Sequence, residues 1–164
     1  MSDTLSLNGL TPARRWGSAS NSTGTNMYDI QSGNATAMFT GDLVYSNSGT
    51  LKLVSAGDGS LLPIGVFQGC EYTAPNGTPT WSPYWPAAQA TLTSATAIGY
   101  VVDDPYATFF VQADAAVSAT KLNTYNYEVT VGVSGSTYTG RSNSGLDAAS
   151  GTAGIAALLR PIAY

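Results

Sequence analysis

The sequence contains no histidine and only one cysteine, Cys70. Without histidine the chain lacks the usual general base near neutral pH, and every nucleophilic pair that includes a histidine is excluded. A single cysteine cannot form a disulfide within the chain, and a zinc site would lack its usual ligands. We therefore expect no catalytic residue, no metal and no cofactor. Cys70, between Gly69 and Glu71, is expected to be a small buried strand residue.

Charged side chains are also scarce. They make up 10% of the 164 residues, against roughly 25% in average soluble domains. The net charge is −4, and the six Lys and Arg residues are scattered. Phosphates require a denser basic field, so the composition excludes nucleic acid as a partner. A surface built from Ser, Thr, Asn and Gly pays a small desolvation penalty when it docks against another protein. The composition therefore favours a protein that functions within an assembly.

Long apolar runs are missing as well. None approaches the roughly 20 residues of a membrane span, and the N-terminus lacks the basic-then-apolar order of a signal peptide. We therefore expect synthesis in the cytoplasm and no membrane partner. The length is that of one ordinary domain and is sufficient to bury a core without disulfides.

From Met38 onward, short extended runs alternate with clusters of Gly, Pro, Asn and Asp, which is typical of an all-β fold. The only helical candidate, residues 113–122, is too short to define the fold. The sequence predicts a single compact antiparallel β-barrel or β-sandwich over residues 34–164. The expected strands span residues 43–45, 51–54, 64–67, 91–93, 98–102, 108–112, 125–133 and 155–159.

The stretch 98–114 contains two apolar runs joined at Asp103, Asp104 and Pro105, and it predicts a β-hairpin. Pro105 fixes φ, and an Asp before proline accepts backbone amides and starts a turn. An ion site is the less favoured interpretation, because adjacent side chains of an extended segment point to opposite faces.

Residues 1–33 are poor in aliphatic side chains and have no sustained periodicity, so they predict an extended N-terminal arm. Within it, Arg14, Arg15 and Trp16 form a candidate docking peptide, because guanidinium groups pair with carboxylates while an indole buries apolar area. The alternative is that Trp16 folds back onto its own domain while the arginines stay solvated.

Four aromatic side chains fall within fourteen positions and are interrupted by prolines: Tyr72, Trp81, Tyr84 and Trp85. Such rings stack on sugars in carbohydrate-binding modules. In a structural protein they anchor a long loop or fill a subunit interface.

Four stretches of the chain, in order along residues 34–147, resemble one known family. They read NATAMFTGDLV at 34–44, GVFQGCEY at 65–72 with SPYWP at 82–86, IGYVVDDPYATFFVQAD at 98–114, and TGRSNSGLD at 139–147. The colinear set is similar to the capsid decoration, or cement, proteins of tailed bacteriophages, small virion proteins encoded near the major capsid protein. No single motif in the set is a catalytic fingerprint.

This resemblance implies a non-enzymatic protein that binds the outer surface of the mature phage head and stabilises contacts between capsomers. The implied partner is the major capsid protein, and the implied assembly is a homotrimer, with a dimer as the fallback. From residue type, we expect Arg14, Arg15 and Trp16 to contact the capsid. Tyr84 and Trp85 are expected at a subunit or capsid boundary.

Two other functions remain open from the sequence. A carbohydrate-binding head fibre or lectin-like virion module would use the same β scaffold and the aromatic loop. A hydrolase would need two acids about 5 to 10 Å apart, for which Asp103 and Asp114 are the candidates. Ser118 and Lys121 have the spacing of some acyl-transfer enzymes, but the partner motifs of those enzymes are absent.

Overall fold

The computed structural model describes residues 7–16, 24–54, 62–92, 97–130, 135–153 and 159–162. Within these ranges the regular structure consists of ten strands and two three-residue 3₁₀ turns, η2 (Ala119–Lys121) and η3 (Ala148–Ser150). The all-β prediction is therefore confirmed. In the same ranges, no helix is long and apolar enough to cross a membrane.

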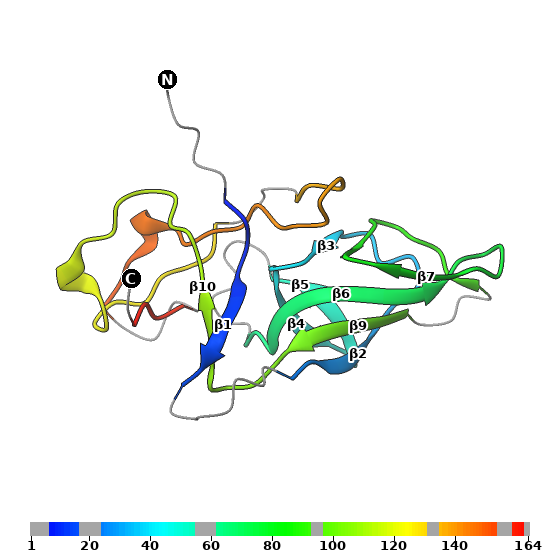
Figure 1. Cartoon of the computed structure of the whole chain (residues 1–164), viewed down its shortest axis with the longest axis horizontal. Helices are drawn as coiled ribbons and strands as arrows, with labels where there is room; N and C mark the ends of the chain where they lie inside the picture. The colour runs from blue at the N-terminus through cyan, green and yellow to red at the C-terminus, as the bar shows by residue number, and fades with distance from the viewer. Residues whose placement is uncertain are drawn as a thin grey trace, which may run out of the picture.

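Five strands form a closed barrel (Figure 1). Its order is β4–β5–β2–β9–β6, and a direct β4–β6 pairing closes the ring. The strands are β2 (Asn26–Ile30), β4 (Leu43–Asn47), β5 (Thr50–Leu53), β6 (Gly65–Thr73) and β9 (Ala97–Val102).

One pairing departs from the antiparallel prediction. Strands β2 and β5 are parallel, with Asp29 opposite Thr50, whereas the other four pairings of the ring are antiparallel. Strand direction cannot alternate all the way around a ring with an odd number of strands. At least one parallel pair is therefore unavoidable in a closed barrel of five strands, and the barrel is mixed.

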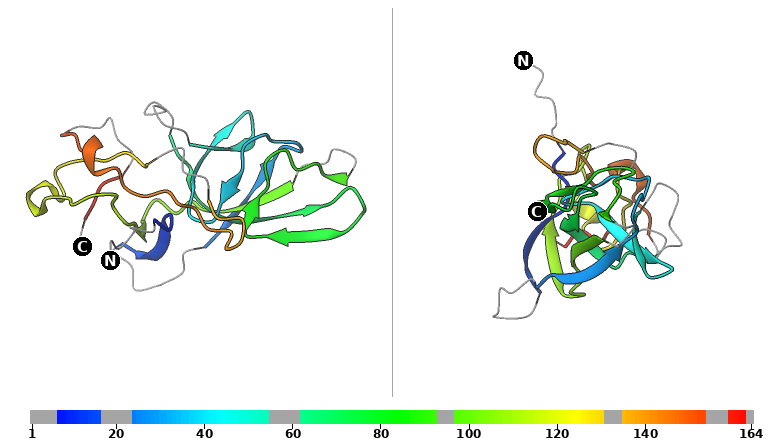
Figure 2. Two further views of the ribbon diagram at one scale, coloured as in Figure 1. Left: turned by 90° about the horizontal axis from the view of Figure 1, so that it is seen from above. Right: turned by 90° about the vertical axis from the view of Figure 1, so that its right-hand side faces the viewer.

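The remaining strands lie outside the ring. Strand β7 (Pro79–Ser82) extends the sheet beyond β6, and β3 (Met38–Phe39) pairs with β8 (Tyr84–Trp85). Strands β1 (Thr11–Arg15) and β10 (Ala107–Phe110) pair with each other as a separate two-stranded ribbon. Figures 1 and 2 show this β1–β10 ribbon between the barrel and a lobe built from the segments that follow β10.

Two apolar clusters hold these parts together. The first fills the barrel, where inward side chains of β2, β4, β5, β6 and β9 meet Met38 of β3 and Trp85 of β8. The second lies where the lobe and the ribbon cover the outside of β4 and β6. Its buried members are Leu10, Leu43, Val54, Val66 and Val129, and Phe109, Val111 and Leu159 pack against them.

The predicted N-terminal arm, residues 1–33, is wrong in extent. Residues 26–30 form β2 between β5 and β9 of the barrel, and Thr11–Arg15 pairs with β10. A half-buried strand needs apolar side chains on one face only. Tyr28 and Ile30 supply that face in β2, which is why a segment with so few aliphatics still belongs to the barrel.

The predicted hairpin over residues 98–114 is also wrong, although its turn forms. Asp104 Oδ1 accepts the Tyr106 amide at 2.9 Å, and Asp104 O accepts the Ala107 amide at 2.9 Å, as expected for an Asp before proline. Both edges of β9 are occupied by β2 and β6. The chain after the turn therefore cannot pair with β9, and it pairs with β1 instead.

The other strand predictions have mixed outcomes. Strands β4, β5, β6, β9 and β10 confirm the runs at 43–45, 51–54, 64–67, 98–102 and 108–112, with ends that differ by a few residues. In 125–133 the described residues form only isolated bridges, and Thr91 and Leu92 form no strand. The predicted helix reduces to η2. Residues 93, 131–133 and 155–158 lie outside the described residues.

The burial of Trp85 leads to a test. This side chain is 0% exposed, and its Nε1 donates to the Asn34 carbonyl at 3.3 Å. Trp85→Ala is expected to lower the free energy of unfolding by about 3–5 kcal/mol, because it leaves a large cavity. Trp81→Ala is the matched control, since Trp81 is 63% exposed, and it should cost less than about 1 kcal/mol. Urea denaturation measures the free energy of unfolding of both variants. Equal losses of stability in the two variants would contradict the placement of Trp85 in the core.

Candidate functional site

The β1–β10 ribbon has one buried and one exposed face. Its register places Thr11 opposite Phe110 and Pro12 opposite Phe109, with a bulge between Pro12 and Arg14. Phe109 packs against the second apolar cluster. Phe110, the next residue, points the other way because side chains alternate along a strand, and it is 73% exposed.

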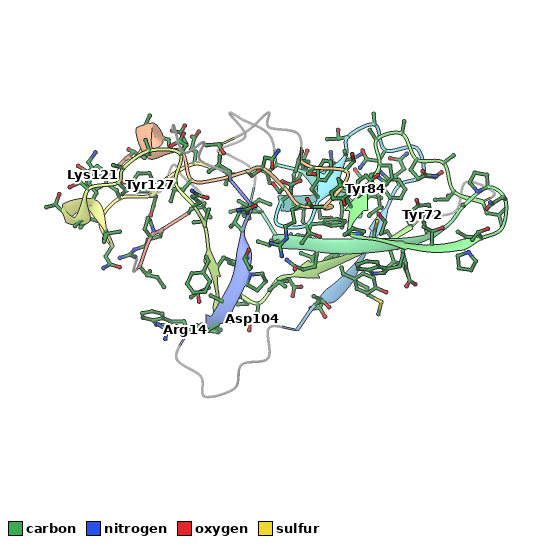
Figure 3. The ribbon with its side chains drawn as sticks, turned by 45° about the horizontal axis from the view of Figure 1, so that its top comes forward. Arg14, Tyr72, Tyr84, Asp104, Lys121 and Tyr127 are labelled. Carbon is green, nitrogen blue, oxygen red and sulfur yellow. The ribbon has the colours of Figure 1, made fainter. Side chains whose placement is uncertain are left out.

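Three further side chains extend the exposed face. Trp16 directly follows β1 and is 55% exposed, and its backbone amide donates to the Tyr106 carbonyl at 2.7 Å. Tyr106 itself is 58% exposed. Arg14 is exposed opposite Thr108, whose hydroxyl donates to the Arg14 carbonyl at 2.8 Å (Figure 3). We call these four residues, Arg14, Trp16, Tyr106 and Phe110, the ribbon face.

The ribbon face contains two of the three residues that were predicted to contact the capsid near the N-terminus. Arg14 and Trp16 were expected at a docking surface, and both are exposed. Arg15 lies in β1 opposite Ala107. Tyr106 and Phe110 were not identified from the sequence, because their exposure depends on the pairing of β1 with β10. Three exposed rings beside a guanidinium group supply apolar area and a partner for a carboxylate.

The second predicted contact, Tyr84 with Trp85, is not supported for Trp85. Its indole lies in the barrel core, edge-on to Tyr72 with ring centroids 5.5 Å apart. Tyr84 is half-buried and stacks on Phe39 at 5.2 Å. Trp85 is fully enclosed, so its prediction at a subunit or capsid boundary is wrong, and its role is that of an internal anchor. Of the four loop aromatics, Trp81 is the most exposed.

A buried carboxylate, Asp42, fixes the position of the ribbon. Asp42 Oδ2 accepts the Phe39 amide at 2.8 Å. Asp42 Oδ1 accepts the hydroxyls of Ser142 and Ser144 at 2.5 and 3.1 Å. The residue is 4% exposed. It therefore joins the corner between β3 and β4 to a segment one hundred positions later.

The start of β1 is held at the same place. Gly9 donates its amide to Ser144 O, and Leu10 donates to Gly41 O, each at 2.9 Å. Gly9 and Gly41 have φ of +71° and +98°, and a Cβ on Gly9 would lie 3.0 Å from the Gly41 Cα. Side chains at these positions would separate the two backbones. The close contact thus sets where β1 leaves the barrel.

Burial raises the pKa of Asp42 above its ordinary value of 3.8, against the opposing effect of the hydrogen bonds from Ser142, Phe39 and Ser144. The folded chain consequently binds this proton more tightly than the unfolded chain. The contribution of Asp42 to stability is complete below about pH 3.8 and is lost as the pH rises through the raised pKa.

The carboxylates proposed for a hydrolase have structural partners. Asp103 accepts the Tyr28 hydroxyl at 2.6 Å and the Asn26 amide at 2.9 Å. Partial burial acts to raise its pKa, but these hydrogen bonds outweigh burial and lower the pKa below 3.8. Asp114 Oδ1 accepts the Ala148 amide at 2.9 Å in the lobe. Each acid thus holds its own part of the fold.

Two other reactive groups are placed by the fold. Cys70 is buried in β6, as predicted, and burial raises the pKa of its thiol to about 12. The Ser118 hydroxyl lies 2.9 Å from the Thr120 hydroxyl. Among the described residues, no group of three or more Cys, Asp or Glu side chains is arranged to hold a metal ion.

Comparison with protein-family models, with curated proteins and with solved structures gives no match to this chain. The similarity to capsid decoration proteins therefore stays a prediction from the sequence. Among the described residues, the ribbon face combines three exposed aromatic rings with an exposed arginine.

Replacing Asp42 tests the buried junction. Asp42→Asn keeps an acceptor for the Phe39 amide and can donate to the serine hydroxyls, but it does not titrate. Wild type loses the contribution of Asp42 as the pH rises from about 3.8 through the raised pKa, and the variant does not. The free energy of unfolding of the variant, relative to that of the wild type, should therefore increase as the pH is raised above about 3.8. Asp42→Ala leaves three donors without a partner and should cost about 2–4 kcal/mol. Urea titrations at a series of pH values measure the free energy of unfolding of both variants. If this free energy depends on pH in the same way in the wild type and in Asp42→Asn, Asp42 is not the group that titrates at the buried junction.

Proposed function

We propose that this chain is a capsid decoration protein that binds the outer surface of a mature phage head through its ribbon face. The observation that carries the proposal is the exposed set of three aromatic rings and Arg14 on the paired strands β1 and β10. Aromatic and arginine side chains are the residue types that dominate binding energy at protein interfaces. Carboxylates of the major capsid protein are the expected partners of Arg14.

The scarcity of charge supports the same function. A surface with 10% charged residues has few groups whose desolvation opposes docking. Many copies bound to a shell add stability by mass action, provided that the binding site is complete only in the expanded shell. This role requires contact area and positioning, and it requires no reacting group.

We further expect a homotrimer, with a dimer as the fallback, at symmetric positions of the shell. Trp85 lies in the barrel core, so the contact between subunits must use other surfaces. Multi-angle light scattering of the purified chain measures the assembly directly. A mass of 16.9 kDa, that of one chain, at all concentrations would contradict this expectation.

Cosedimentation tests the function. The purified chain is mixed with procapsids and with expanded heads of the phage that encodes it, both free of the protein. Saturable pelleting with expanded heads alone is expected. The triple variant Arg14→Ala, Trp16→Ala, Phe110→Ala should bind at least about 100-fold more weakly, because interface hot spots are each worth about 2 kcal/mol or more.

Trp81→Ala is the matched control, since it removes an exposed indole from a different part of the surface. It should bind heads as the wild type does. Unchanged pelleting of the triple variant would contradict the role of the ribbon face. Absence of pelleting with either form of head would contradict the capsid function altogether.

A further inference from the structure

The outer wall of the barrel presents a second aromatic surface, separate from the ribbon face. Four neighbouring strands, β7, β6, β9 and β2, place two rows of residues on it, because cross-strand partners point to the same side of a sheet. One row is Trp81, Glu71, Ile98 and Asp29. The other is Gly69, Tyr100 and Met27. Figure 1 shows β6, β9 and β2 running side by side here.

Gly69 allows the Trp81 indole to lie across the strand. A Cβ built on Gly69 would be 3.3 Å from Trp81 Cζ2 and 3.0 Å from the Ser82 carbonyl oxygen, and φ at Gly69 is +139°. Any larger residue would therefore displace the ring. With only hydrogen at this position, the indole lies close to the backbone of Gly69, whose partner on β9 is Tyr100.

The result is an apolar strip that spans four strands and takes its large side chains from three of them, β7, β9 and β2. Trp81 is 63% exposed, Met27 is 67% exposed, and Tyr100 between them is half-buried. Adjacent strands lie about 4.8 Å apart, so the strip extends over roughly 10–15 Å. Its width is that of single side chains, which suits a narrow, elongated ligand with flat apolar faces.

Carboxylates line one side of the strip. Glu71 Oε2 accepts the Tyr100 hydroxyl at 2.9 Å, which joins these side chains of β6 and β9 on the outer face of the sheet. Asp29 is exposed in the same row of residues. Their oxygens are acceptors for hydroxyl donors, and charge-assisted hydrogen bonds are the stronger class. Two negative charges beside the strip disfavour an anionic ligand.

We propose that this surface binds a neutral oligosaccharide, with pyranose faces stacked on Trp81 and Tyr100 and sugar hydroxyls donated to Glu71 and Asp29. We call it the glycan platform. A sugar ring has an apolar face for an aromatic side chain and equatorial hydroxyls for the carboxylates, and this chemistry matches both features of the strip. The proposal is independent of capsid binding, which concerns the ribbon face.

Two other occupants fit less well. A second copy of this chain carries the same carboxylates and a net charge of −4, so a face-to-face contact would bring like charges together. Among the described residues β7 pairs with β6 alone. Strand addition at its outer edge is opposed by the short length of β7 and by Pro79, which has no amide to donate.

The test is a titration of the full-length, ¹⁵N-labelled chain with neutral hexasaccharides: cellohexaose, laminarihexaose, maltohexaose, mannohexaose and chitohexaose, each to about 10 mM. The chain has three tryptophans, so three indole N–H resonances report on it. The Trp81 resonance is expected to shift saturably with at least one sugar. The resonances of Trp16 and of the buried Trp85 should not move.

Two variants test whether sugar binding takes place at the glycan platform. Trp81→Ala should weaken sugar binding at least about tenfold. Because this variant lacks the Trp81 indole, its binding is measured from the backbone amide resonances of Met27 and Tyr100. Trp16→Ala is the matched control and should bind as the wild type does. No shift of Trp81 with any sugar, or undiminished binding by Trp81→Ala, would overturn the proposal. Concentration-dependent broadening of the Trp81 resonance without sugar would also overturn it, in favour of a second copy.

Discussion

The buried carboxylate of Asp42 is the junction on which the arrangement of this molecule depends. It joins the corner that leads into β4 to the hydroxyls of Ser142 and Ser144, far along the chain. Gly9 and Gly41 meet beside it and bring β1 to the same place. A desolvated carboxylate is costly unless its oxygens are occupied. Both oxygens of Asp42 accept hydrogen bonds, although burial outweighs these bonds and raises its pKa. The bonds connect the corner between β3 and β4 to the segment that contains Ser142 and Ser144.

Closure of the barrel explains why the ribbon exists. Once β2 and β6 occupy both edges of β9, the segment after the Asp104 turn has no edge of β9 to join. It pairs instead with β1, and the two strands cover the outside of the barrel through Phe109. Their other face carries Trp16, Tyr106 and Phe110. The exposed aromatic surface thus follows from the topology rather than from a local sequence motif.

Local patterns predicted local features well. Short extended apolar runs bounded by turn residues identified β4 and β9, proline chemistry identified the Asp104 turn, and the burial of Cys70 followed from its residue type. Pairing partners depend on long-range closure, which no local pattern encodes, so the hairpin and the extent of the arm were wrong. Trp81 and Trp85 lie four positions apart in one Pro-rich stretch, but Trp81 belongs to β7 at the edge of the sheet and Trp85 to β8, which pairs with β3 over the barrel core.

The structure presents two aromatic surfaces on different elements, the ribbon face on β1 and β10 and the glycan platform on β7, β6, β9 and β2. The proposed function requires that the ribbon face docks on a protein shell. The most direct measurement is an electron cryomicroscopy map of expanded heads saturated with this chain, at a resolution that places individual strands. We expect β1 and β10 to lie against the shell, with Arg14, Trp16 and Phe110 in the contact. A map in which this ribbon faces solvent would contradict it.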